Sequence, residues 1–294
     1  MRDWENTFIS WSKGPGRTEI DRCENAISAI RGAISISDKL KIRSIHVFLQ
    51  GSYKNRVNVR QDSDVDIGIV CFDSFFPDYL EGTSAEKVGN VNAHYHYSQF
   101  KNEVEEALVA KFGYFGVERG NKAFDIQSNS YRVEADVAPF FEHRRYYKNR
   151  KAISGVQLIS DNGGKVINWP DQHYSNGIIK NTVCKRRYKR VVRILKKLCI
   201  EMQNKSINSA LFVPGFLIEC LVYNVPNKYF AHETYTDDVR SSLAFVFNNT
   251  QADSDCEEWT EVSKLKYLFG THQKWTQEQA HNFIADAWDY IGFE

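Results

Sequence analysis

Apolar positions alternate between helical and strand-like spacing along the first third of the chain. From Thr18 to Leu40 they recur every three or four residues, which predicts an amphipathic helix. Residues 44–49 are a short β-like run that leads to Gly51 and Ser52. A second apolar run, Ile67 to Val70, predicts another strand. The pattern therefore gives the order helix, strand, Gly-Ser turn, strand.

Beyond residue 70 the pattern predicts a mixed first part and a helical second part. Residues 75–98 read as a loop, 99–112 as a helix, 123–127 and 131–137 as a hairpin, and 156–169 as a further β segment. Helices are expected at 181–202, 210–223, 236–247 and 276–291. We place a domain boundary near residue 170, which separates an α+β lobe at 1–170 from a helical lobe at 171–294.

The strand after the Gly-Ser turn carries the candidate chemistry. Asp64 and Asp66 are two residues apart, so in a strand both carboxylates lie on one face. Such a pair, completed by phosphates and water, suits Mg²⁺. Gly51 lets the backbone approach a phosphate, and Ser52 adds a hydroxyl. Asp62 precedes the apolar run, and we interpret it as a solvated turn residue.

A third acid, Asp136, lies on the second strand of the predicted hairpin. If this hairpin pairs beside the strand of Asp64 and Asp66, the three carboxylates form the cluster that holds two metal ions for phosphoryl transfer. One ion would activate an attacking hydroxyl, and the other would neutralise a triphosphate. The residues therefore favour metal-dependent chemistry on a nucleotide.

Composition limits the kinds of partner and the cellular location that we expect. The net charge is +1, so a nucleotide or nucleic-acid site must be a local patch. The six cysteines are widely spaced, which argues against structural zinc and a disulfide framework and makes a reducing cytoplasm the expected location. No apolar run approaches the length of a membrane span, so we expect neither a signal peptide nor a membrane partner.

The helix expected from residue 181 has a basic stripe formed by Arg186, Arg190, Arg193 and Lys197. For most of these residues the favoured interpretation is the solvated face of an amphipathic helix. One or two could still bind phosphate through charge-assisted hydrogen bonds. No P-loop motif is present, which excludes that class of NTPase.

Taken together, the motifs resemble the nucleotidyltransferase superfamily of polymerase-β type. The similar segments are Leu49–Asn55, Asp62–Asp66 and Glu134–Val137, and in the helical half His173–Gly177, Lys180–Asn181, Tyr188–Lys189, Arg193–Lys196 and Glu219–Pro226. The chain is most similar to the bacterial cGAS/DncV-like nucleotidyltransferases (CD-NTases) of anti-phage signalling, clade E. The resemblance implies an α+β, two-lobed nucleotidyltransferase fold. It also implies synthesis of a cyclic dinucleotide by 3′-hydroxyl attack on an α-phosphate, with release of pyrophosphate.

The resemblance also implies roles for individual residues. It makes Asp64, Asp66 and Asp136 the catalytic metal ligands for two Mg²⁺ ions, with Mn²⁺ as a substitute. It assigns nucleotide binding to Gln50, Gly51, Ser52, Asn168, Lys180 and Lys196, with Lys196 on the triphosphate. In this clade an Asn before the aromatic-Pro pair accompanies acceptance of uracil, and Asn168 precedes Trp169-Pro170. We therefore expect UTP and ATP as substrates, and cyclic UMP-AMP or cyclic di-UMP as product.

Other functions remain open at this point. A linear nucleotidyltransferase acting on an RNA 3′ end or on a protein would use the same metal site. An inactive binding scaffold is a third possibility, which the intact acids and Gly-Ser turn oppose. The cysteine spacing cannot build a zinc ribbon like that of animal cGAS, so no requirement for duplex DNA is expected. A downstream effector would bind the cyclic product.

Overall fold

The computed structural model describes residues 2–59, 65–130, 132–254 and 256–294. Its contacts divide the chain into two compact units. The sheet unit comprises Gly16–Lys54 and Arg60–Pro170, and the helical unit comprises Met1–Pro15, Asn55–Val59 and Asp171–Glu294. The predicted division into a catalytic lobe at 1–170 and a helical lobe at 171–294 stays a prediction about function. The contacts add two N-terminal segments to the helical unit.

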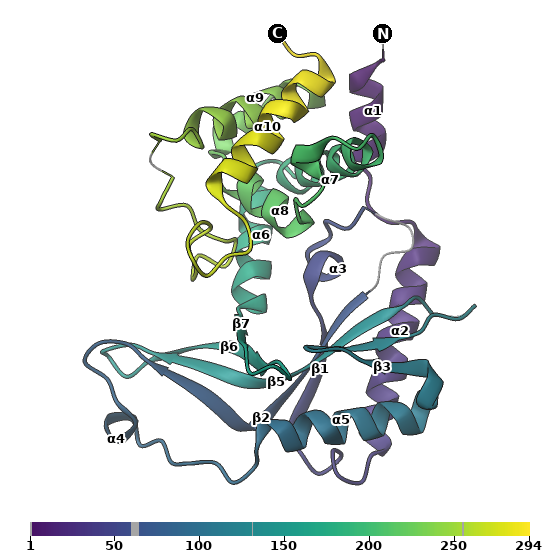
Figure 1. Ribbon diagram of the computed structural model, residues 1–294, viewed down its shortest axis with the longest axis vertical. Coiled ribbons are helices and arrows are strands. Elements are labelled where there is room, and N and C mark those ends of the chain that lie inside the picture. Colours follow the sequence, from purple (N-terminus) through teal and green to yellow (C-terminus); the bar gives the residue numbers. More distant parts are fainter. Residues whose placement is uncertain (1, 60–64, 131, 255) are drawn as a thin grey trace. The chain divides into compact units, whose positions relative to one another are not determined.

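A mixed sheet forms the centre of the sheet unit (Figure 1). Its strands are β1 (Ile45–Leu49), β2 (Val65–Tyr79), β3 (Val117–Arg119), β4 (Phe124–Ile126), β5 (Ala135–Tyr146), β6 (Ala152–Ile159) and β7 (Lys165–Asn168). They pair in the order β1-β2-β5-β4-β3, and β6 joins β5 to β7. The β2–β5 pair is parallel, whereas the other pairs are antiparallel.

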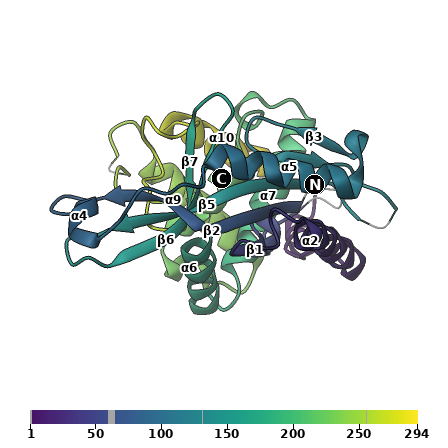
Figure 2. The same cartoon turned by 90° about the horizontal axis from the view of Figure 1, so that it is seen from below.

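Two long helices, α2 (Arg17–Ile36) and α5 (Tyr97–Phe112), cover one face of this sheet, as Figures 1 and 2 show. Their apolar stripes form one core with strand residues such as Val65, Ile67 and Val137. Side chains alternate between the two faces along a strand. The residues between these core positions, Asp66 and Asp136, therefore face away from the helices.

The structure confirms the predicted helices and hairpin of this unit, with shifted ends. The expectation of a loop from residue 75 is wrong, because β2 continues to Tyr79 beside β5 and the short helix α4 (Ala85–Val88) follows. The second hairpin strand begins at Ala135 and continues to Tyr146, well beyond the predicted end at residue 137. Tyr131, where that strand was expected to begin, lies outside the described residues.

The helical unit packs around α7 (Tyr188–Asn204), whose apolar stripe is buried against its neighbours (Figure 1). The surrounding helices are α1 (Trp4–Trp11), α6 (Pro170–Val183), α8 (Gly215–Asn224), α9 (Tyr235–Asn249) and α10 (Gln277–Ile291). Thr276 caps α10 in a capping box with Gln279. Among the described residues, no helix is both long and apolar enough to cross a bilayer.

Helix α1 was not expected from the sequence, and polar contacts hold it in the helical unit. Arg193 of α7 donates from Nε to the carbonyl of Ser12 at 2.7 Å and from Nη1 to the carbonyl of Arg56 at 2.6 Å. Glu5 of α1 accepts from the backbone N–H groups of Tyr235 and Thr236, at 2.9 and 2.8 Å. One arginine thus anchors both N-terminal segments, and one glutamate caps α9.

The prediction of one continuous helix at 181–202 is wrong, because the helix is interrupted between α6 and α7. Lys185 and Arg186 have φ values of 48° and 66°, which end a right-handed helix. The side chain of Asn181 then accepts from the N–H of Lys189 at 3.1 Å and caps the new helix. No Gly or Pro marks this break in the sequence.

Candidate active site

The structure brings Asp66 and Asp136 together. They are register partners on the parallel strands β2 and β5, so their side chains lie next to each other on one face of the sheet. Both are partly buried. The expected pairing of the hairpin beside the first acidic strand is therefore present, although the partner strand is parallel to β2.

Gly51 lies directly against this pair. A Cβ atom placed on Gly51 would come within 1.9 Å of Asp66 Oδ2, and its φ of +62° disfavours other residues. The neighbouring N–H of Gln50 donates to the carbonyl oxygen of Asp66 at 2.9 Å. Glycine is thus required twice, for the turn and for the approach of the backbone to the carboxylate.

Ser52 follows Gly51 in the one-and-a-half-turn helix α3 (Gly51–Asn55). The sequence predicted a turn here, and the structure closes it into this short helix. Gln50 and Ser52 are partly buried, and Gly51 is exposed. Of the three neighbouring residues predicted to bind the nucleotide, Gly51 lies against the carboxylate of Asp66 and Gln50 is bonded to its backbone carbonyl.

Two of the three predicted metal ligands can be placed. Asp64, the third, lies in 60–64, outside the described residues, as does Asp62. Within the described part of the chain, no group of three or more His, Cys, Asp or Glu side chains could hold a metal ion. Two adjacent carboxylates beside a glycine backbone nevertheless suit a hard divalent cation whose coordination is completed by phosphate and water.

Sequence reasoning did not single out Asp125. It lies on β4 in register with Asp136, so Asp66, Asp136 and Asp125 form a row across three neighbouring strands. Asp125 is exposed. Its alternation with the buried Phe124 and Ile126 was the available signal, but the hairpin register needed to place it opposite Asp136 cannot be read from the sequence.

Asn168 ends β7, in the same sheet as the two acids. Trp169 and the backbone carbonyl of Asn168 pack closely on Gly155. A Cβ atom on Gly155 would lie 2.6 Å from the Trp169 ring and 2.7 Å from the Asn168 carbonyl oxygen. The amide of Asn168 is partly buried and makes no hydrogen bond to any residue that the structure describes. Its donor and acceptor are therefore available to a ligand.

Lys196 lies in the helical unit and belongs to a buried charge cluster. Its Nζ is 3.7 Å from Glu219 Oε2, and Nε2 of His173 is 2.9 Å from Glu219 Oε1. Burial alone would raise the pKa of Glu219. The hydrogen bond with His173 and the positive charges of Lys196, His173 and Lys189 lower that pKa below its ordinary value. No sequence pattern links these residues.

Lys180, also in the helical unit, has internal partners. Its Nζ donates to the carbonyl of Val225 at 2.7 Å and to Asn227 Oδ1 at 3.1 Å. Aromatic rings of Tyr188, Tyr223 and Phe230 surround it at 5.3–5.7 Å. Burial lowers the pKa of Lys180 to about 8. Its predicted contact with a nucleotide stays a prediction.

Known proteins share this architecture. Residues 175–292 match the model of the cGAS/DncV-like nucleotidyltransferase C-terminal helical domain. The chain is 44% identical over 293 residues to the cyclic dipyrimidine nucleotide synthase CdnE of Legionella pneumophila, covering 98% of each chain. It is 39% identical to the protein of the same name from Cecembia lonarensis, again covering 98% of each chain.

A solved structure agrees in fold. The Rhodothermus marinus CdnE c-UMP-AMP synthase, solved with Apcpp and Upnpp, is 28% identical, with a TM-score of 0.87 and coverage of 98% of this chain and 97% of that one. The mixed α/β fold class and the resemblance found in the sequence are confirmed. With relatives this similar over nearly its whole length, the chain belongs to the cGAS/DncV-like nucleotidyltransferase family, the CD-NTases.

Proposed function

We propose that this protein is a cyclic dinucleotide synthase. It joins two nucleoside triphosphates by attack of a 3′-hydroxyl on an α-phosphate with release of pyrophosphate, and a second such step closes the ring. The observation that carries the proposal is the register of Asp66 with Asp136 beside Gly51. The names of the relatives support the same reaction.

The carboxylates define where the metal ions are held. Nucleotidyltransferases of this family are generally metal-dependent. Asp64, Asp66 and Asp136 would bind two Mg²⁺ ions, or Mn²⁺ in their place. The ions would supply charge neutralisation of the triphosphate and a lower pKa for the 3′-hydroxyl. The residues themselves would orient the triphosphate, with the backbone at Gly51 against it and the hydroxyl of Ser52 as a donor to it.

At least one substrate is UTP, and we propose cyclic UMP-AMP or cyclic di-UMP as product. Asn168 supports this choice, because its amide has both a donor and an acceptor that the described residues leave unused. The tight packing of Trp169 on Gly155 fixes the backbone position of Asn168, from which the side-chain amide extends. The named pyrimidine preference of two relatives points the same way.

The wider setting is also a proposal. The product would serve as a signal read by a downstream effector in anti-phage defence. The cytoplasm supplies the nucleoside triphosphates, and its reducing environment suits six cysteines that are all buried and that form no disulfide in the described part of the chain. We expect no membrane partner and no requirement for duplex DNA.

The test is product analysis. Purified protein is incubated with Mg²⁺ and all four NTPs, and the products are treated with phosphatase and identified by chromatography and mass spectrometry. A small, phosphatase-resistant, uridine-containing product is expected without any acceptor. In a parallel reaction with labelled NTPs and an added RNA or protein, label that appears only on this acceptor would indicate a linear nucleotidyltransferase. No turnover under any of these conditions would indicate a binding scaffold.

A further inference from the structure

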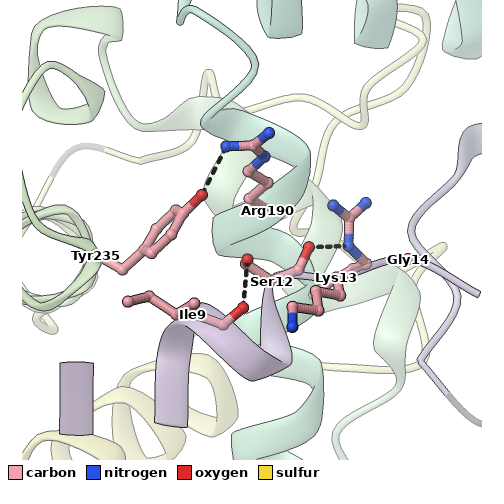
Figure 3. Close-up of a pocket in the computed structure, with 7 residues that line it drawn as sticks. Ile9, Ser12, Lys13, Gly14, Arg190 and Tyr235 are labelled. Atoms are coloured by element: carbon pink, nitrogen blue, oxygen red, sulfur yellow. Dashed lines mark hydrogen bonds between the residues drawn. The ribbon is translucent and has the colours of Figure 1, made fainter. Parts of the chain in front are cut away.

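A pocket of about 410 Å³ lies in the helical unit, between the end of α1 and α7. Its walls include Ser12, Lys13, Gly14, Arg190, Arg193 and Tyr235, all from that unit (Figure 3). None of these residues has a part in the proposed reaction. The pocket therefore needs its own explanation.

Positive charge dominates the pocket. Within the described part of the chain, Lys13, Arg190 and Arg193 form no ion pair, although all three line it. Arg193 is only 9% exposed. Its two bonded nitrogens donate to backbone carbonyls, which are neutral and leave the charge uncompensated. Burial and the neighbouring Arg190 lower the pKa of Arg193 to about 10.

Hydrogen-bond donors remain available there. Nη2 of Arg193 has no partner among the described residues. Arg190 is exposed and donates to Tyr235 Oη at 2.7 Å (Figure 3), which leaves the phenolic O–H of Tyr235 able to donate to a ligand. Glu5, on the same helix α1, is occupied by the N–H groups that begin α9. The site thus offers donors and cations without a carboxylate of its own.

We propose that this pocket binds the phosphoryl group of a small phosphorylated molecule. Arginine guanidinium groups and a lysine ammonium form charge-assisted hydrogen bonds with phosphate oxygens. The anion would compensate the buried charge of Arg193. The pocket is then a second phosphate site, assembled where Arg193 anchors the segment after α1 to α7.

Binding is tested without turnover, with EDTA present, so that the outcome does not depend on the proposed synthase activity. Inorganic pyrophosphate is titrated into the full chain and followed by calorimetry and ³¹P NMR. The double variant Lys13→Gln/Arg190→Gln changes the pocket at residues outside the apolar core. Its control, Arg186→Gln/Lys205→Gln, removes the same charge at exposed positions outside the pocket.

We expect saturable binding that weakens at least about tenfold in the pocket variant, as the loss of charge-assisted bonds predicts, and that persists in the control. Arg193→Gln should abolish binding, but its two carbonyl contacts also hold the fold. The exposed double variant therefore decides the matter. Absence of saturable binding in the parent protein, or equal loss in both double variants, would overturn the proposal.

Discussion

The carboxylates of the sheet unit and the cations of α7 are positioned by different physical means. Asp66 and Asp136 are adjacent because the β2–β5 register places them so, and the backbone ladder needs neither side chain. Lys196 and Arg193 are buried and bonded to other groups. Substitution of an acid whose position is set by strand register should therefore leave the fold intact. Substitution of a buried cation should destabilise the fold, because its bonds are part of the folded structure.

This difference predicts how each region responds to substitution. Removing a carboxylate at a register position changes chemistry and leaves packing intact. Removing one member of a buried charge cluster leaves its partners unpaired in a low dielectric, which lowers the free energy of unfolding. Substitutions in the two regions should therefore separate activity from stability.

The largest effect is expected for Asp66→Asn. The amide is nearly isosteric but is a poor ligand for a hard cation, so product formation should fall at least about 1,000-fold. Thermal denaturation should be almost unchanged, since the register does not depend on the carboxylate. Product yield from UTP and ATP, together with the melting temperature, tests both statements.

Asp125→Asn is the matched control for this prediction. Asp125 lies in the same row of register partners but on the far side of Asp136 from Asp66. It should retain activity within about tenfold of the parent protein, because it is not among the proposed ligands. Equal loss in the two variants would extend the catalytic site to β4, and unchanged activity of Asp66→Asn would remove the metal-site assignment.

Glu219→Gln should show the opposite behaviour, with its main effect on stability. Neutralising this carboxylate leaves the buried Lys196 without its counter-charge and alters the hydrogen bond with His173, at a cost of about 3 kcal/mol in the free energy of unfolding at neutral pH. The folded-state pKa of Glu219 lies below its ordinary value of 4.5. The ionised form therefore stabilises the fold above about pH 4.5, and this contribution is lost as the pH falls through the folded-state pKa.

Urea denaturation from pH 3 to pH 7 measures this effect. The parent protein should lose stability steeply on acidification, and Glu219→Gln should flatten that slope. Asp238→Asn is the control with the opposite sign, because burial raises the pKa of Asp238 despite Arg187 and His232. The ionised form of Asp238 costs stability as the pH rises through its folded-state pKa, and the variant removes that loss. Parallel slopes in the two variants would contradict the assigned directions.

The acidic site could be predicted from sequence because strand periodicity and a hairpin are local signals. The alternation around Asp66 and Asp136 predicted which face of the sheet each carboxylate occupies, and one assumption about strand pairing placed the two next to each other, whereas Asp125 was missed. The cations could not be placed in this way. The basic stripe of the helix expected from residue 181 was interpreted as a solvated face, which holds for Arg186, before α7, and for Arg190 but not for Arg193. Its acceptors, on Ser12 and Arg56, are far away in the sequence and are backbone atoms.

Gly51→Ala tests whether the contact at the acids is steric, and a smaller effect is expected. The methyl group would meet Asp66 Oδ2 at 1.9 Å and would also disfavour the positive φ. Product formation should fall about tenfold or more, with a loss of about 2 kcal/mol in stability. Product yield and urea denaturation measure the two effects.

Gly89→Ala is the control for this variant. Gly89 also has a positive φ, of +76°, but a Cβ there meets nothing within 4 Å. It should lose about 1 kcal/mol of stability through the backbone alone and keep its activity. If Gly51→Ala and Gly89→Ala behave alike, backbone conformation rather than the contact with Asp66 explains the requirement for glycine.

The smallest effect is expected for Asn168→Ser, which asks whether the sheet unit also selects the base. A serine hydroxyl cannot present a donor and an acceptor side by side to uracil, and loss of one hydrogen bond of about 1 kcal/mol changes a substrate ratio about fivefold. Incorporation of UTP relative to ATP, measured in competition, should fall by that factor. Asn204→Ser, at the exposed end of α7, should leave the ratio unchanged. An unchanged ratio in Asn168→Ser would move base selection away from β7, and the sheet unit would then supply the chemistry without the specificity.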